Sequence, residues 1–98
     1  MRETQYQVEL IKRIRELLPG CVILKNDPKY VQGVPDILIL YRKQWAMLEV
    51  KMGDLAHIQP NQEFYIETLN EMSFASFINP DTEEDVLNEL QRAFGTRR

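Results

Sequence analysis

The chain has 98 residues, enough for one hydrophobic core, so we expect a single domain over residues 1–98. Its 44% hydrophobic and 28% charged residues match the averages of globular proteins and exclude an intrinsically disordered chain. The formal net charge of -3 argues against a protein that coats DNA by phosphate neutralisation alone.

From the sequence we expect neither export nor membrane insertion. The first residues lack the apolar region of a secretory leader, and no apolar run has the roughly 20 residues needed to cross a bilayer. The single cysteine, Cys21, cannot form an intramolecular disulfide, and we expect it in the core. These features predict a cytoplasmic protein without a membrane partner.

The N-terminal part of the chain is predicted to form a helix, a short strand and a loop. Apolar residues recur every three or four positions over Glu3–Leu18, which indicates an amphipathic helix that ends at Pro19-Gly20. Residues 21–24 are prone to form a strand. Residues 26–33 are rich in turn formers and predict an irregular loop.

Two apolar runs in the middle of the chain predict an antiparallel hairpin. Residues 37–40 are apolar without a break, so we expect this strand in the middle of a sheet covered on both faces. Residues 45–50 form the second strand. The polar segment Arg42-Lys43-Gln44 supplies the turn between them.

The C-terminal part is predicted to contribute a helix, a strand and a last helix. Pro60 suits the first position of a helix that extends to about Glu71, with Phe64, Leu69 and either Tyr65 or Ile66 facing inward. Residues 73–78 form the last strand candidate. Thr82 with Asp85 resembles a cap for a terminal helix. The order is therefore α-β-β-β-α-β-α, which predicts an α/β fold with a central mixed sheet flanked by helices.

The hairpin places two carboxylates opposite each other. If Arg42 and Lys43 are the loop residues, counting outward from them brings Asp36 opposite Glu49. Opposed side chains in an antiparallel pair have Cβ atoms roughly 4.5–5.5 Å apart, and like charges at this spacing repel. A divalent cation such as Mg²⁺ would relieve the repulsion, because hard cations prefer oxygen ligands.

The Glu-x-Lys segment adds a cation to the same face. Strand side chains alternate, so Glu49 and Lys51 share a face while Val50 points the other way. Lys51 can then hold a scissile phosphate or orient the attacking water, and the carbonyl of Val50 is a further candidate ligand. A bound metal would polarise a phosphodiester and lower the pKa of water.

The same residues also have ordinary interpretations. An Asp at a strand end and a surface Glu-Lys pair are often solvated charges without a function. A domain with this pattern could therefore be a nuclease, a non-catalytic DNA-binding or assembly subunit, or a module that binds another protein.

The motifs together resemble a known family. The strings GVPDILILY and WAMLEVK are similar to the PD-(D/E)xK nuclease superfamily, and the GVPD form most resembles its VRR-NUC branch, which includes small stand-alone phage proteins. Glu3 and Gln7 in the first helix and Pro60-x-Gln62 at the start of a later helix also match the pattern. The resemblance covers nearly the whole chain.

This resemblance implies a restriction-endonuclease-like core and an endonuclease that cleaves DNA with Mg²⁺ or Mn²⁺. Asp36, Glu49 and Glu3 would be metal ligands, and Lys51 the catalytic cation. Members are similar to Holliday-junction resolvases and to nucleases that act on other structured DNA such as flaps. Stand-alone forms are typically homodimers, and a phage-encoded one would act in the host cell.

The family pattern also suggests substrate-binding residues. These are Gln7 and Gln62, and the loop residues Lys25 and Lys29 are further substrate-binding candidates outside that pattern. A first-turn carboxylate such as Glu3 is more often a partner of the helix dipole, and Gln62 is more often a solvated helix residue. The sequence departs from the pattern at Gln32, before Gly33, where arginines are expected. The candidates to replace these arginines in binding DNA are Lys25, Lys29 and Tyr30.

Overall fold

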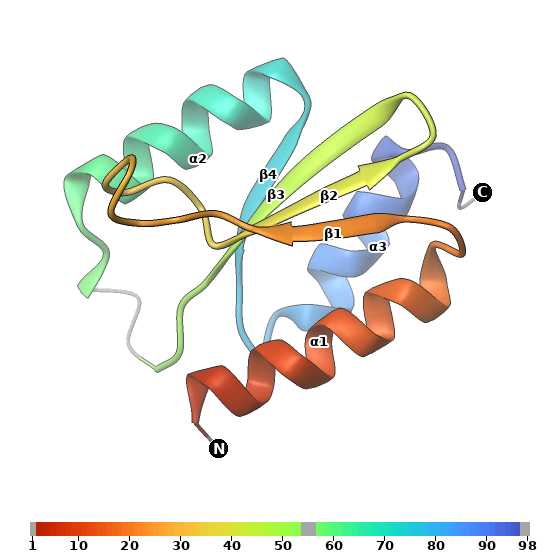
Figure 1. The fold of residues 1–98 in the computed structure, drawn as a ribbon, viewed down its shortest axis with the longest axis horizontal. Coiled ribbons are helices and arrows are strands. Elements are labelled where there is room, and N and C mark those ends of the chain that lie inside the picture. The colour runs from red at the N-terminus through yellow and green to blue at the C-terminus, as the bar shows by residue number, and fades with distance from the viewer. Residues whose placement is uncertain (1, 54–56, 97–98) are drawn as a thin grey trace.

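The computed structural model describes residues 2–53 and 57–96 of the chain. These residues form three helices and four strands (Figure 1). In chain order the elements are α1 (Glu3–Leu17), β1 (Val22–Lys25), β2 (Ile37–Tyr41), β3 (Gln44–Val50), α2 (Pro60–Met72), β4 (Phe74–Ile78) and α3 (Glu83–Ala93). This order confirms the α/β fold class predicted from the sequence.

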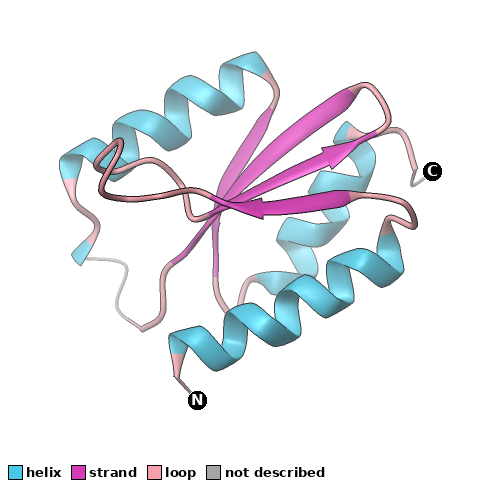
Figure 2. Cartoon of the chain, viewed as in Figure 1, coloured by secondary structure: helices cyan, strands magenta, loops and turns pink. Residues whose placement is uncertain are grey.

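The four strands form one mixed sheet in the order β1-β2-β3-β4. Neighbouring strands pair antiparallel from β1 to β3. β3 and β4 are parallel, because α2 connects the end of one to the start of the other. Figures 1 and 2 show α1 and α3 on one side of the sheet and α2 on the other. No helix in the described part of the chain is both long and apolar enough to span a bilayer.

The hydrophobic core lies between the sheet and the pair of helices α1 and α3. Alternate strand residues enter it, namely Ile37, Ile39 and Tyr41 of β2 and Ala46, Leu48 and Val50 of β3. The helices contribute Tyr6, Leu10, Ile14, Val86, Leu87 and Leu90 at helical spacing. Since strand side chains alternate, Asp36 and Glu49 point to the opposite side of the sheet, toward α2.

The α2 side of the sheet is less covered than the sequence predicts. β2 was expected to be buried on both faces, but Leu40 is 38% exposed and Leu38 is only partly buried. Phe64, predicted to face inward, is 58% exposed, and no described residue of α2 is fully buried. Both predictions are wrong because α2 packs mainly on β4 at one edge of the sheet, which leaves β1 and β2 without a helix above them.

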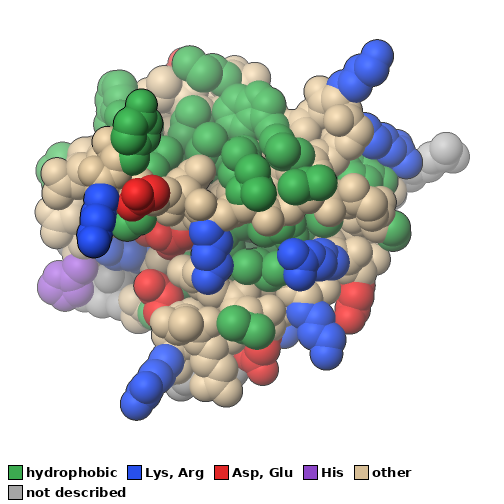
Figure 3. Space-filling model, in the orientation of Figure 1, with side chains coloured by type: hydrophobic (Ala, Val, Ile, Leu, Met, Phe, Trp, Pro, Cys, Tyr) green, Lys and Arg blue, Asp and Glu red, His purple; other side chains and the backbone are tan. Residues whose placement is uncertain are grey.

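This geometry leaves an apolar face, formed by Val22, Leu24, Leu38 and Leu40. Val22 pairs with Leu40 and Leu24 with Leu38, so the four side chains lie on the same side of neighbouring strands. Figure 3 shows hydrophobic side chains gathered over the strands on the open side of the sheet.

The start of α3 also differs from its prediction. Thr82 occupies the N-cap position, but its side chain makes no cap hydrogen bond to the helix. Instead, the Thr82 hydroxyl accepts the backbone amide of Asn79 over 3.1 Å, and Asn79 Oδ1 accepts the backbone amides of Asp81 and Thr82, which precede the first turn of the helix. The predicted cap of Thr82 with Asp85 is therefore wrong, because the Thr82 hydroxyl bonds back to Asn79 in the turn before the helix.

Gly33 of the 26–36 loop lies against Asn61 of α2, and this contact allows a prediction. Gly33 has a φ of 91°, and a Cβ there would lie 2.7 Å from Cγ of Asn61. We expect Gly33→Ala to lower the free energy of unfolding by about 1–3 kcal/mol in urea titrations, because it adds backbone strain and a collision.

Gly20→Ala is the matched control for this prediction. Gly20 has a similar φ of 88°, but nothing lies within 4 Å of its Cβ position, so it measures the backbone strain alone. Removing the Asn61 side chain should recover part of the excess loss in Gly33→Ala. Equal losses for the two glycine variants would contradict the close contact.

Candidate active site

The β2–β3 hairpin has the predicted register. Tyr41 lies opposite Gln44 at the turn, and the pairing continues outward along both strands. One step beyond the last paired residues, Asp36 stands opposite Glu49. The Asp36 carboxylate accepts a hydrogen bond from the backbone amide of Val50 over 3.2 Å, which extends the ladder through a side chain. The two carboxylates are therefore neighbours, as the count along the sequence predicts.

Both carboxyl groups have pKa values shifted toward the neutral form. Burial raises the pKa of Glu49 to about 8, aided by the negative charge of Asp36, and the residue is only 6% exposed. Burial also raises the pKa of Asp36, against the lowering effects of the Val50 amide, of Glu49 and of nearby lysines. Two interacting acids of this kind titrate as a pair, so in the metal-free protein they share a proton near neutral pH.

Lys51 lies beside the carboxylates, and Gln62 joins them. The ammonium of Lys51 donates to Oε1 of Gln62 over 3.3 Å, and Nε2 of Gln62 donates to Oε2 of Glu49 over 3.4 Å. The same Oε1 accepts the backbone amide of Gln59 over 3.1 Å, in a capping box at the start of α2. The structure thus places the predicted residue Gln62 within the site and gives it a fixed orientation.

The N-terminus of α1 brings Glu3 to the edge of the site. Burial and the charge of Asp36 raise the pKa of Glu3, while the charge of Lys51 lowers it, so these groups are close enough to interact. Gln7 lies one turn further along α1 and is buried with the core residues of the helix. Its contact with a substrate stays a prediction.

Two basic residues predicted to bind the substrate lie on the segment that leads to Asp36. Lys25 ends β1, and its charge counteracts the rise in pKa that burial causes in Asp36, which places it near the site. Lys29 is exposed in the loop, where its backbone amide donates to the Asp27 carboxylate over 2.8 Å.

Sequence reasoning missed Asn26, which fixes the backbone around Asp36. Its backbone amide donates to the Asp36 carbonyl over 2.9 Å, and its side-chain amide donates to the Pro35 carbonyl over 2.8 Å. Asn79 acts similarly on the neighbouring strand, since its side-chain amide donates to the Lys51 carbonyl over 3.5 Å. Both residues contact backbone carbonyls, and no spacing in the sequence marks such partners.

The donor set suits a hard divalent cation. Asp36 and Glu49 offer adjacent carboxylate oxygens, and the Val50 carbonyl is the next candidate. Within residues 2–53 and 57–96, no three His, Cys, Asp or Glu side chains gather closely enough to hold a metal ion, so Glu3 does not complete a three-carboxylate cluster. Mg²⁺ often binds through only one or two protein carboxylates, with water and phosphate oxygens as its other ligands. The pair therefore fits Mg²⁺ or Mn²⁺, and does not fit a closed zinc site.

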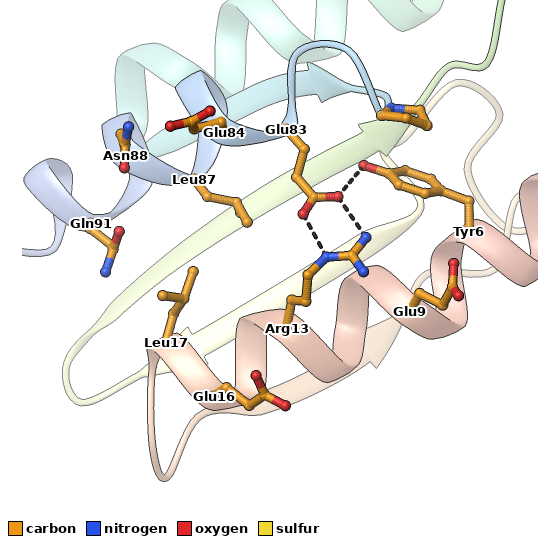
Figure 4. A pocket seen from close by; sticks show the side chains of 11 residues that line it. Tyr6, Glu9, Arg13, Glu16, Leu17, Glu83, Glu84, Leu87, Asn88 and Gln91 are labelled. Atoms are coloured by element: carbon orange, nitrogen blue, oxygen red, sulfur yellow. Dashed lines mark hydrogen bonds and ion pairs between the residues drawn. The ribbon is translucent and has the colours of Figure 1, made fainter.

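A groove of about 690 Å³ lies between α1 and α3, on the other side of the sheet (Figure 4). None of the predicted site residues lines it. Glu83 of α3 accepts hydrogen bonds from Arg13 over 2.6 and 2.7 Å and from the Tyr6 hydroxyl over 2.7 Å. Burial alone would raise the pKa of Glu83, but these hydrogen bonds and the charge of Arg13 lower it. Because the three groups satisfy one another, we interpret them as a connection between the helices.

Comparisons of the chain with family models, with curated proteins and with solved structures find no match. The interpretation of the site therefore depends on its own geometry and chemistry.

Proposed function

We propose that the chain is a Mg²⁺- or Mn²⁺-dependent DNA endonuclease of the VRR-NUC branch of the PD-(D/E)xK superfamily, acting on structured DNA such as Holliday junctions or flaps. The observation that supports this most is the juxtaposition of the buried Glu49 carboxylate and the partly buried Asp36 carboxylate with an ammonium group that Gln62 links to Glu49. A fold gains nothing in stability from opposed carboxylates, so their pairing favours a role in binding a cation.

Each side chain has a specific role in the proposed hydrolysis. Asp36 and Glu49 hold the cation, which when bound polarises the phosphate and lowers the pKa of water. Lys51 directs its ammonium at the scissile phosphate and stabilises the negative charge that develops there. Water gives up a proton to solvent as its oxygen bonds to phosphorus, the bond to the leaving sugar oxygen breaks, and that oxygen takes up a proton from solvent. Gln62 orients the ammonium of Lys51 and one carboxylate.

The proposal places the protein in the cytoplasm and, if phage-encoded, in the infected cell. The net charge of -3 does not oppose it, because bound divalent cations reverse the local charge around the carboxylates.

A substrate panel tests this function. Purified protein is incubated with labelled junction, flap, single-stranded and continuous duplex DNA, with Mg²⁺, with Mn²⁺ and with EDTA. We expect cleavage with either metal, preference for a structured substrate and no cleavage in EDTA. Binding without cleavage under every condition would reject the nuclease and favour the alternative, a non-catalytic DNA-binding or protein-interaction subunit.

The proposed role of Gln62 leads to a prediction about the rate of DNA cleavage. Gln62→Leu removes the link between Lys51 and Glu49, and we expect cleavage about 10- to 100-fold slower, the usual cost of losing a residue that orients metal ligands. Glu63→Gln, a change at the neighbouring exposed residue, is the control and should cleave at the parent rate. An unchanged rate in Gln62→Leu would show that the link has no part in the reaction.

We also propose that the protein acts as a homodimer, because two sites related by a twofold axis can cut a twofold-symmetric junction in both strands. The exposed apolar face on β1 and β2 supports an association through this side of the sheet. Analytical ultracentrifugation should give a mass near twice 11.6 kDa. A monomer at micromolar concentration under cleavage conditions would contradict the dimer.

A further inference from the structure

Tyr30 is the most exposed large hydrophobic residue described in the structure. It is 88% exposed, compared with 69% for Met72 at the end of α2. A ring in water contributes nothing to the core. Proteins that bind single-stranded nucleic acid use such rings as platforms on which bases stack, next to lysines that attract phosphates.

Backbone hydrogen bonds hold Tyr30 in a defined turn. We call residues 27–34 the tyrosine loop. The amides of Tyr30 and Val31 donate to the Asp27 carbonyl over 3.1 and 3.5 Å, and the Asp27 carboxylate accepts the amide of Lys29. Val34 donates to the Val31 carbonyl over 3.4 Å, which closes the second half of the loop. The ring is therefore presented from an ordered segment.

The tyrosine loop borders the candidate active site at both of its ends. On one side, Asn26 donates to the Asp36 and Pro35 carbonyls. On the other, Gly33 packs against Asn61, the residue before Gln62. Figure 1 shows the loop lying alongside the first turns of α2. Tyr30 is four residues from Asn26, so their Cα atoms are at most about 14 Å apart. Because Asn26 is hydrogen-bonded to Asp36, this length is of the order of the distance from Tyr30 to the site, and it corresponds to at most about four nucleotides at the duplex rise of 3.4 Å.

The charges near the ring favour a nucleic-acid backbone. Lys29 precedes Tyr30 in the loop, and Lys25 lies near Asp36, as its effect on that carboxylate shows. These two ammonium groups outnumber the one carboxylate of the loop, Asp27, so the loop attracts phosphates near a stacked base. A base inside a continuous duplex has both faces covered by its neighbours, so only an unpaired or unstacked base can lie on the ring.

We infer that the tyrosine loop binds an unpaired nucleotide, with its base stacked on Tyr30, within about four nucleotides of the phosphate held at Asp36, Glu49 and Lys51. The inference depends on the proposed function, because DNA is its ligand. It narrows the substrate class to DNA with an unpaired nucleotide near the cut, as in a flap, a gap or an opened branch point.

The test measures binding in EDTA, where no cleavage occurs, by fluorescence anisotropy with full-length protein. The probes are a flap with unpaired nucleotides and a continuous duplex of equal length. We expect Tyr30→Ala to bind the flap about 5- to 150-fold more weakly than the parent does. Its affinity for the duplex should stay within about twofold of the parent's affinity. Tyr30→Phe should bind both like the parent, because it keeps the ring. Tyr30→Leu should behave like Tyr30→Ala, because it keeps apolar area without an aromatic face.

Matched controls separate stacking from general surface effects. Val8→Ala changes an exposed apolar residue on α1 and should leave flap binding unchanged. Lys29→Ala should weaken binding to the flap and lower its salt dependence, whereas Lys43→Ala, in the turn at the far end of the hairpin, should not. Circular dichroism confirms that each variant is folded.

The outcomes distinguish this inference from the nuclease proposal. Equal flap binding by the parent and Tyr30→Ala, or equal loss on flap and duplex, would overturn the stacking role even if the parent cleaves DNA. Selective loss on the flap would support it even if no metal produces cleavage, and only the nuclease proposal would then fail. A parent that binds neither probe would overturn the stacking role, and the cleavage panel with Mg²⁺ and Mn²⁺ alone would then decide the nuclease proposal.

Discussion

Replacing Lys51 with alanine is expected to slow single-turnover DNA cleavage by about 10²- to 10³-fold, the usual cost of removing one group that stabilises transition-state charge. Among the described residues, Lys51 is the only one whose cationic side chain is hydrogen-bonded to Gln62. Gln62 in turn donates a hydrogen bond to Glu49. DNA binding in EDTA should fall only a few-fold, because a single phosphate contact is lost. Rates are measured with labelled flap DNA and enzyme in excess.

Lys43→Ala is the matched control for this experiment. Lys43 is an exposed lysine in the turn at the opposite end of the same hairpin, so its removal changes the net charge equally. Its cleavage rate should equal that of the parent. A Lys51→Ala protein that retains more than about a third of the parent rate would show that the ammonium does not act at the reacting phosphate.

The metal-free protein is expected to lose stability as the pH rises from about 5 to 8. Burial raises the pKa of Glu49 from 4.5 to about 8, so in this range the folded protein binds more protons than the unfolded chain. Stability then falls with rising pH, since the proton bound on folding becomes harder to retain. Asp36 and Glu3 also have raised pKa values and act in the same direction. The lowered pKa of Glu83 acts only below its ordinary value of 4.5, outside this range.

Urea unfolding in EDTA at pH 5, 6, 7 and 8 measures this effect, with Glu49→Gln as the comparison. The amide cannot ionise, so we expect the variant to have a flatter pH profile and, at pH 8, a stability at least about 1 kcal/mol above the parent. This difference corresponds to a melting temperature about 4–8 °C higher. Profiles with the same slope in both proteins would contradict a buried, shared proton at Glu49.

The sequence predicted the elements and the central pair of the site because both follow from short-range periodicity. Alternation along two apolar runs and a two-residue turn were sufficient to place Asp36 opposite Glu49. The register is fixed because a slip of one residue would expose every core side chain of β2. The resemblance of the segment Pro60-x-Gln62 to a family pattern also pointed to Gln62, which contacts Glu49 and Lys51.

The errors concern features that depend on tertiary packing. Phe64 is exposed because α2 sits over β4, and nothing in the spacing of its apolar residues specifies this position. Thr82 does not cap α3, because its hydroxyl bonds to Asn79 in the turn before the helix. Asn26 was missed because its partners are the carbonyls of Pro35 and Asp36, which any sequence would offer there.

The measurement that tests the account most directly is calorimetric titration of the metal-free protein with Mn²⁺ at pH 8, on the parent and on Asp36→Asn and Glu49→Gln. We predict that the parent binds the cation and that each variant binds it at least about tenfold more weakly. Binding should also release protons, because the metal displaces the proton shared by the two carboxylates. A parent that binds no Mn²⁺, or variants that bind it as tightly as the parent, would contradict a cation site at Asp36 and Glu49.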